Sequence, residues 1–170
     1  MSRIPKVYLD TNVIISRYKP KDPLFNIAEH LFSKKKYTFI ISPVTLFELY
    51  AVISRIRNHI VIHTTINEFI VDAIVRYILD DCNLKIISKS FLGILQVNNE
   101  KHNIPIEYLI AQKIAEAIPL RALDLLHVGY AYLLRQNLDY FVTGDEEILR
   151  LEKELEEKLG VKVTHPANLV

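Results

Sequence analysis

Four short apolar runs alternate with longer segments of helical periodicity along this chain of 170 residues. The runs are KVYL at 6–9, YTFII at 37–41, LKII at 84–87 and YFVT at 140–143, and VKV at 161–163 is a further candidate. Parallel strands need crossover connections, and helices usually supply them. The alternation therefore predicts an α/β fold, a three-layer α/β/α arrangement around a central, mostly parallel sheet of four to five strands.

Apolar residues between these runs recur at helical spacing. The pattern predicts helices at 24–34, from 43 onward with Ser42 as the cap, and at 66–81, 106–117, 121–135 and 146–159. We expect a turn at the Asp-Thr-Asn after the first strand. Between the third strand and the next helix, residues 91–95 read as a short apolar segment and NNEKHNIP at 98–105 as a polar loop.

Bulk composition narrows the class of protein. The chain has the length of one domain, expected to span residues 1–170, and 21 Lys and Arg against 20 Asp and Glu give a charge of +1. This balance does not favour an obligate nucleic-acid binder, so any such contacts must be local. Cys82 is the only cysteine, which excludes an intrachain disulfide framework and fits a reducing compartment. No run resembles a signal sequence or a membrane span, so we expect a cytoplasmic protein.

Four acidic residues stand out because each is embedded in apolar sequence. They are Asp10 in VYLDTN, Glu48 in VTLFELYAV, Asp124 in RALDLLHV and Asp145 in YFVTGDEEI. Asp10 and Asp145 directly follow predicted strands, and ligands of parallel sheets bind outside the carboxyl ends of the strands. An isolated ionised carboxylate is costly to bury. A shared divalent cation is the simplest partner, and Mg²⁺ or Mn²⁺ prefers such oxygen ligands.

Each acid alone also has a purely structural explanation. Asp10 fits an Asx-turn or a helix cap, and Asp145 fits the cap of the last helix. Asp124 lies in the first turn of its helix, where the helix dipole favours a negative charge. The metal is therefore inferred from the set of four acids and not from any single one.

Glu48 has the weakest structural explanation, because a buried glutamate is rare unless it is paired. Its alternative is an ion pair with Arg55, Arg57 or Arg121. His127 lies one turn after Asp124 on the same helical face. A satisfied, half-buried histidine is the simpler interpretation, so we leave His127 out of the catalytic set.

Together these segments resemble the PIN-domain nucleases, the group that includes the VapC-type toxins. The resemblance rests on VYLDTN at the first strand, SPVTLFEL after the second, ALDLLHVGYA in the late helix and FVTGD after the fourth strand. It implies a compact α/β/α fold and a metal-dependent endoribonuclease acting on RNA. It also implies that the protein is often a homodimer and often restrained by a small antitoxin protein. The segment 56–119 is longer than in the smallest toxins of the family.

On this resemblance, Asp10, Glu48, Asp124 and Asp145 match the acidic quartet of the family, and Asn12 and Thr143 match its supporting polar positions. Asp10, Asp124 and Asp145 would hold one or two Mg²⁺ or Mn²⁺ ions, with Glu48 as a further ligand or as the base that orients the attacking water.

Other classes fit the sequence less well. A phosphoacceptor receiver domain would need paired acids at the first strand and a late strand-end lysine, and a nucleotide-binding Rossmann protein would need a Gly-rich loop that DTNVII lacks. The alternative that stays open is a non-catalytic PIN-fold protein that binds RNA or serves as a scaffold.

Overall fold

A five-stranded parallel sheet forms the centre of the computed structural model, which describes residues 3–34, 36–62, 70–88 and 91–170. The strand order is β3-β2-β1-β6-β7, and every neighbouring pair is parallel. The strands are β1 Lys6–Leu9, β2 Thr38–Ile41, β3 Lys85–Ile86, β6 Tyr140–Val142 and β7 Val163–Thr164. The predicted parallel sheet is confirmed.

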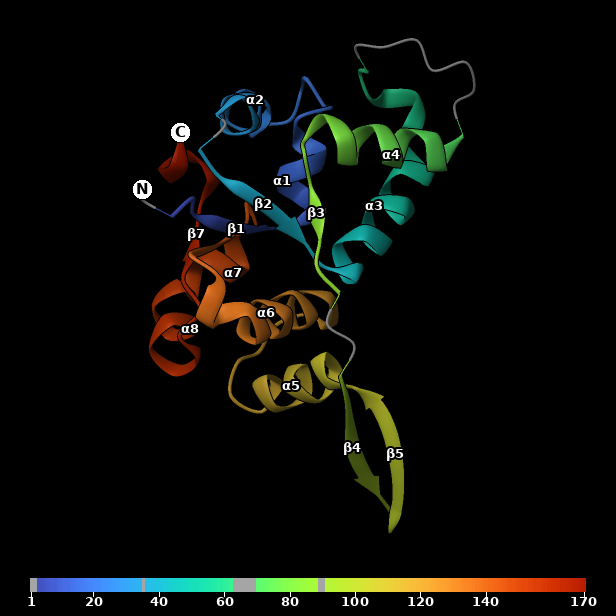
Figure 1. The fold of residues 1–170 in the computed structure, drawn as a ribbon, viewed down its shortest axis with the longest axis vertical. Coiled ribbons are helices and arrows are strands. Elements are labelled where there is room, and N and C mark those ends of the chain that lie inside the picture. Colours follow the sequence, from blue (N-terminus) through green and yellow to red (C-terminus); the bar gives the residue numbers. More distant parts are fainter. Residues whose placement is uncertain (1–2, 35, 63–69, 89–90) are drawn as a thin grey trace.

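Helices cover both faces of this sheet, which gives the expected three layers (Figure 1). One face carries α1 (Thr11–Ser16), α2 (Phe25–Ser33), α3 (Pro43–Ile56) and α4 (Val71–Asp81), and the other carries α5 (Ile106–Ala115), α6 (Ala122–Leu134), α7 (Glu146–Arg150) and α8 (Glu152–Leu159). Short 3-10 turns lie at Arg57–His59, Arg135–Asn137 and Pro166–Leu169. Among the described helices, none has the length and apolar character that crossing a bilayer requires.

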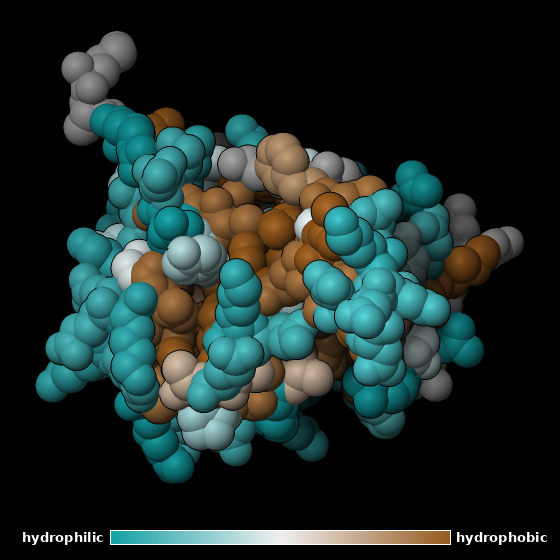
Figure 2. Space-filling view, turned by 90° about the horizontal axis from the view of Figure 1, so that it is seen from below, coloured by the Kyte–Doolittle hydropathy of each residue, from teal (hydrophilic) through white to brown (hydrophobic). Residues whose placement is uncertain are grey.

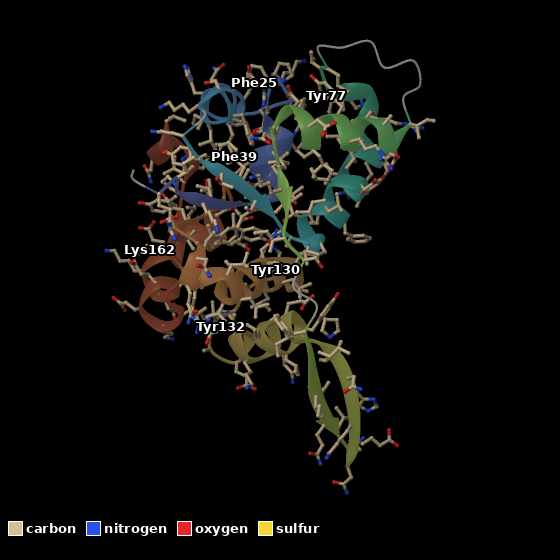
Figure 3. All side chains as sticks on the ribbon, in the orientation of Figure 1. Phe25, Phe39, Tyr77, Tyr130, Tyr132 and Lys162 are labelled. Carbon is tan, nitrogen blue, oxygen red and sulfur yellow. The ribbon has the colours of Figure 1, made fainter. Side chains whose placement is uncertain are left out.

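The strands bury side chains on both faces because they lie between two helical layers. In β1, Val7 and Leu9 point into one hydrophobic cluster and Tyr8 into the other, as the two-residue period of a strand requires. Phe39 on β2 belongs to the first cluster and Tyr130 on α6 to the second (Figure 3). The sheet is thus fixed by two separate cores.

One turn prediction and one helix prediction need correction. The Asp-Thr-Asn segment is not a turn, because α1 begins at Thr11, with one residue between it and the end of β1 at Leu9. The helix expected at 146–159 is divided at Leu151 into α7 and α8. The helix expected from residue 66 begins, within the described residues, at Val71, and residues 66–69 lie outside them.

Residues 92–105 form an antiparallel hairpin where the sequence predicted a short apolar segment and a polar loop. Strands β4 (Leu92–Val97) and β5 (Glu100–Pro105) are joined by Asn98 and Asn99, both of which have positive φ angles, 48° and 66°. A two-residue turn of this kind matches the twist of the flanking strands, and asparagine adopts it more readily than most residues. The prediction of a loop was wrong because the turn signal of this Asn pair was overlooked.

The hairpin packs its base on α5 and projects from the rest of the molecule (Figure 1). A side chain at Gly93 would collide with Leu109 of α5, so the absence of one permits this contact. Three apolar side chains at the start of the hairpin are exposed, those of Phe91, Leu92 and Ile94. Figure 2, which looks at this end of the molecule, shows hydrophobic surface gathered in the middle and framed by hydrophilic side chains.

Ile53 on α3 belongs to the first hydrophobic cluster and Ile94 on β4 to neither, so the two residues test the contribution of that core to stability. Ile53 is fully buried and Ile94 is 62% exposed. We expect Ile53→Ala to lower the free energy of unfolding by about 2–5 kcal/mol, because it leaves a cavity in a packed core. Ile94→Ala should change it by no more than about 0.5 kcal/mol. Urea unfolding followed by circular dichroism measures both, and equal losses would contradict this assignment of the core.

Candidate functional site

The carboxyl ends of β1 and β6 lie side by side in the middle of the sheet. The chain continues from β1 toward β2 on one side, whereas β7 follows β6 on the other side, so this is the point at which the strand order reverses. Open α/β sheets bind ligands at such a point. A cavity of about 440 Å³ lies there, and its lining includes Asp10, Glu48, Asp124 and Asp145, the four acids singled out in the sequence.

Asp10 follows β1 directly and is 7% exposed. Its Oδ2 accepts hydrogen bonds from Nδ2 of Asn12 at 2.8 Å and from Oγ1 of Thr143 at 2.6 Å. Asn12 in turn accepts a hydrogen bond from the backbone N–H of Gly144 on the neighbouring strand end. The two predicted supporting residues therefore both hold the Asp10 carboxylate and tie the end of β1 to the end of β6.

Glu48 reaches the cavity from α3, whose first turn is fixed by Ser42, because the Ser42 Oγ accepts a hydrogen bond from the Thr45 N–H. Oε2 of Glu48 accepts hydrogen bonds from Oγ1 of Thr11 and from Nε2 of His127, each at 2.6 Å. The sequence proposed an arginine as the structural partner of Glu48. The ion pair that the structure gives it is instead with His127, 79 positions away in the sequence.

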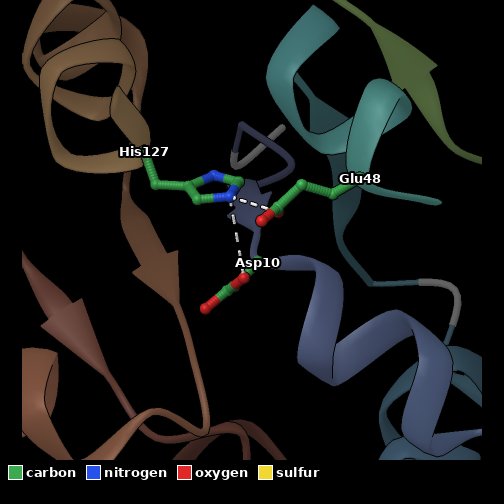
Figure 4. A group of neighbouring side chains, drawn as sticks. All are labelled: Asp10, Glu48 and His127. Carbon is green, nitrogen blue, oxygen red and sulfur yellow. Dashed lines mark hydrogen bonds and ion pairs between the residues drawn. The ribbon is translucent and has the colours of Figure 1, made fainter. Parts of the chain in front are cut away.

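His127 on α6 is the residue that the sequence interpretation placed outside the site. The structure buries it almost completely, at 1% exposure, and its Nδ1 lies 2.7 Å from the hydroxyl of Tyr8 on β1. Its Nε2 also lies 3.9 Å from Oδ1 of Asp10 (Figure 4). The prediction of a satisfied histidine is confirmed, but His127 is buried and not half-buried. Its partners include two of the four acids, so it belongs to the site. Its place one helical turn from Asp124 was the available signal.

Asp10, Glu48 and His127, here called the inner group, have mutually dependent pKa values. Burial raises the pKa of Asp10, against the opposing charge of His127. Burial also works against the charge of Glu48, but the hydrogen bonds from His127 and Thr11 outweigh it and lower the Glu48 pKa. Burial disfavours a charged His127, yet the hydrogen bond to Glu48 and the charge of Asp10 raise the His127 pKa. The contact between Glu48 and His127 thus favours the charged form of each residue.

Asp124, Asp145 and Arg121 form an outer group at the cavity mouth. Oδ2 of Asp124 accepts a hydrogen bond from Nε of Arg121 at 2.9 Å, and Oδ2 of Asp145 accepts one from Nη2 of Arg121 at 2.7 Å. Oδ1 of Asp145 caps α7 by accepting hydrogen bonds from the N–H groups of Glu147 and Ile148. The expected cap role of Asp145 is therefore present. Arg121, considered in the sequence only as a partner of Glu48, is instead a partner of the other two acids.

Three carboxylates leave one oxygen uncommitted. Among the described residues, Oδ1 of Asp10, Oε1 of Glu48 and Oδ1 of Asp124 accept no hydrogen bond from a side chain, although each partner oxygen does, and Oδ1 of Asp10 faces Nε2 of His127 at 3.9 Å. All three residues line the cavity. Carboxylate oxygens are ligands that Mg²⁺ and Mn²⁺ prefer, so this donor set fits a hard divalent cation.

One ligand atom each from Asp10, Glu48 and His127 lies within 4.8 Å of the other two. A carboxylate accepts and does not donate, so Nε2–H of His127 donates to Glu48. While this hydrogen bond is kept, Nε2 has no lone pair for a metal. We therefore regard His127 as an anchor of Glu48 and the carboxylates as the candidate ligands.

The raised pKa of His127 predicts a pH dependence of stability in the protein kept metal-free with a chelator. Because His127 binds its proton more tightly folded than unfolded, its contribution is fully present below its ordinary pKa of 6.5 and is lost as pH rises through the folded value. Wild type should therefore lose stability relative to His127→Gln as pH rises above 6.5. Urea unfolding of both proteins at a series of pH values measures this difference, and parallel curves would contradict it.

Residues 7–154 match the PIN domain family, a family of nucleases, so the match covers most of the chain and spans all four acids. A search of the curated proteins gives no match to this chain. The order of the acids along the sequence, their convergence on one cavity and the match over 7–154 agree, and the chain belongs to the PIN domain family.

Proposed function

We propose that this protein is a metal-dependent endoribonuclease that hydrolyses RNA phosphodiester bonds in the cavity at the ends of β1 and β6. The observation that carries the proposal is the convergence of Asp10, Glu48, Asp124 and Asp145, from four separate segments, on one cavity. Three of them keep an uncommitted oxygen there. Membership of the PIN domain family supports the nuclease class, and RNA as the substrate comes from the resemblance to the toxin ribonucleases.

Asp10, Asp124 and Asp145 are the proposed ligands of Mg²⁺ or Mn²⁺, with Glu48 as a further ligand or as the base that orients the attacking water. The bound ion would supply positive charge at the scissile phosphate and lower the pKa of water. Asn12 and Thr143 fix the orientation of Asp10, and His127 and Thr11 fix that of Glu48. These four residues hold the carboxylates in place before any ion arrives, which reduces the cost of binding it.

The lowered pKa of Glu48 bears on which of its two roles applies. A carboxylate with a low pKa is ionised at neutral pH and is a good cation ligand, whereas a general base works best with a pKa near the operating pH. The Glu48 environment therefore supports the ligand role more than the base role. The homodimer and the antitoxin partner that the resemblance implies stay predictions.

Cleavage of RNA tests the proposed activity. We expect wild type to cut single-stranded or structured RNA with Mg²⁺ or Mn²⁺ and to be inactive with a chelator. Asp10→Asn should lower the rate by about a hundredfold or more, because it removes a charge that holds the ion. Asp80→Asn, an exposed change on α4 away from the cavity, is the matched control and should keep full activity. Gel analysis of end-labelled RNA measures all three proteins.

Two outcomes of this assay would overturn the proposal. Equal cleavage by wild type and Asp10→Asn would indicate a contaminating nuclease. RNA binding without cleavage by a folded wild-type protein would favour the non-catalytic PIN-fold alternative.

Metal binding can be tested without RNA. We expect Mn²⁺ to raise the unfolding temperature of wild type, because a ligand that binds only the folded state stabilises it by about 2.7 kcal/mol at a hundred times its dissociation constant. Asp10→Asn should show a smaller shift, since one ligand charge is lost. Differential scanning calorimetry with and without Mn²⁺ measures both, and an unchanged wild-type midpoint would contradict the metal site.

A further inference from the structure

The outer group contains a cation of its own. The guanidinium of Arg121 lies 2.9 Å from Asp124 and 2.7 Å from Asp145, and its Nε lies 3.3 Å from Oε2 of Glu147. Arg121 directly precedes α6, so its side chain starts beside the first helical turn that carries Asp124. The planar fork of an arginine can bind two carboxylates at once, as it does here.

Arg121 binds the same two carboxylates that a divalent ion would bind at the cavity mouth. Both oxygens of Asp145 are occupied, Oδ1 by the N–H groups at the start of α7 and Oδ2 by Arg121. Oδ2 keeps a second lone pair, but a divalent ion bound there would lie close to the guanidinium of Arg121 and would be repelled by its charge. The cap is made by backbone groups fixed within the helix, whereas Arg121 is a flexible side chain that is 64% exposed. The arginine is the partner that can leave.

We propose that Arg121 is an internal counter-cation that holds Asp124 and Asp145 in the metal-free protein and competes with the divalent ion for them. This inference rests on the proposed metal site and adds a residue that limits metal affinity there. The guanidinium offsets the repulsion between the two acids, so the site keeps its shape without an ion. Entry of the ion then displaces Arg121 from the Oδ2 atoms into solvent at the cavity mouth.

The balance of charges explains why the displacement is feasible. Ion pairs of exposed arginines contribute little, because solvent screens them and the long side chain loses freedom when it is fixed. Burial raises the pKa of Asp124, and Arg121 acts against that shift, so this carboxylate gains from any nearby cation. A divalent ion brings twice the charge and reaches the inner acids as well. Arg121 therefore weakens metal binding without preventing it.

Titration of metal-free protein with Mn²⁺ by isothermal calorimetry tests this competition. We expect Arg121→Gln to bind Mn²⁺ about three- to tenfold more tightly than wild type, since the competing cation is gone. Arg121→Lys, which keeps the charge but not the planar fork, should fall between the two. Without metal, Arg121→Gln should unfold at a temperature about 1–3 °C lower than wild type.

Arg76→Gln is the matched control. Arg76 on α4 forms an exposed pair with Asp72 at 2.6 Å, outside the lining of the cavity, so the variant loses the same charge and the same kind of contact. It should bind Mn²⁺ with the wild-type affinity. A gain as large as that of Arg121→Gln would show a general effect of net charge and would overturn the proposal.

Failure of this inference can be distinguished from failure of the proposed function. If wild type and Arg121→Gln bind Mn²⁺ with equal affinity, or Arg121→Gln binds it more weakly, Arg121 is not a competitor, while the metal site stands. If neither protein binds Mn²⁺, both the metal site and the competition are overturned.

Discussion

Mutual repulsion among four carboxylates at one edge of the sheet is the constraint on which the rest of the site depends. Parallel strands bring their carboxyl ends together, so the residues after β1 and β6 meet whatever their charge. Negative charges at short range destabilise one another unless each has a partner. The surrounding residues are arranged to supply those partners, and they do so differently in the inner and outer groups.

The inner group uses fixed donors and the outer group uses a movable one. Asp10 is held by Asn12 and Thr143, and Glu48 by Thr11 and the buried His127, which Tyr8 supports from β1. These hydrogen bonds fix the orientation of both carboxylates and leave their other oxygens facing the cavity. The outer acids instead share Arg121, which is mostly exposed. The cavity thus combines the inner group, which is preorganised, with the outer group, which can exchange Arg121 for another cation.

Local signals made much of this structure predictable. The strand at 6–9 and the cap at Ser42 follow from short patterns of apolar residues and one Ser-Pro step, and the structure has both as predicted. The four acids were found because carboxylates in apolar sequence are unusual. The hairpin was missed for two reasons: the turn signal of Asn98 and Asn99 was overlooked, and its mostly exposed strands show little alternation of apolar and polar residues.

Partners that are distant in sequence were not predictable. Neither the pair of Glu48 with His127 nor the bridge of Arg121 to Asp145, 24 residues away, follows from spacing alone, because each depends on how two helices dock on the sheet. The pair of Arg121 with Asp124 could have been predicted but was not, since residues three apart at a helix start are neighbours. Positions 121, 124 and 127 lie on one face at the start of α6. This face carries Arg121 and His127, the two residues whose contacts with the acids were missed.

The charge of Asp10 separates a functional from a structural explanation of the site. Its contacts with Asn12 and Thr143 both end on Oδ2, and an amide oxygen could accept the same two hydrogen bonds without a charge. Burial raises the Asp10 pKa, so at neutral pH the ionised form costs stability in the metal-free protein. The charge of His127, whose Nε2 lies 3.9 Å from Oδ1, offsets this cost only in part, because the Asp10 pKa stays raised. A cation bound at Oδ1, as proposed, would offset the rest and would account for a carboxylate at this position.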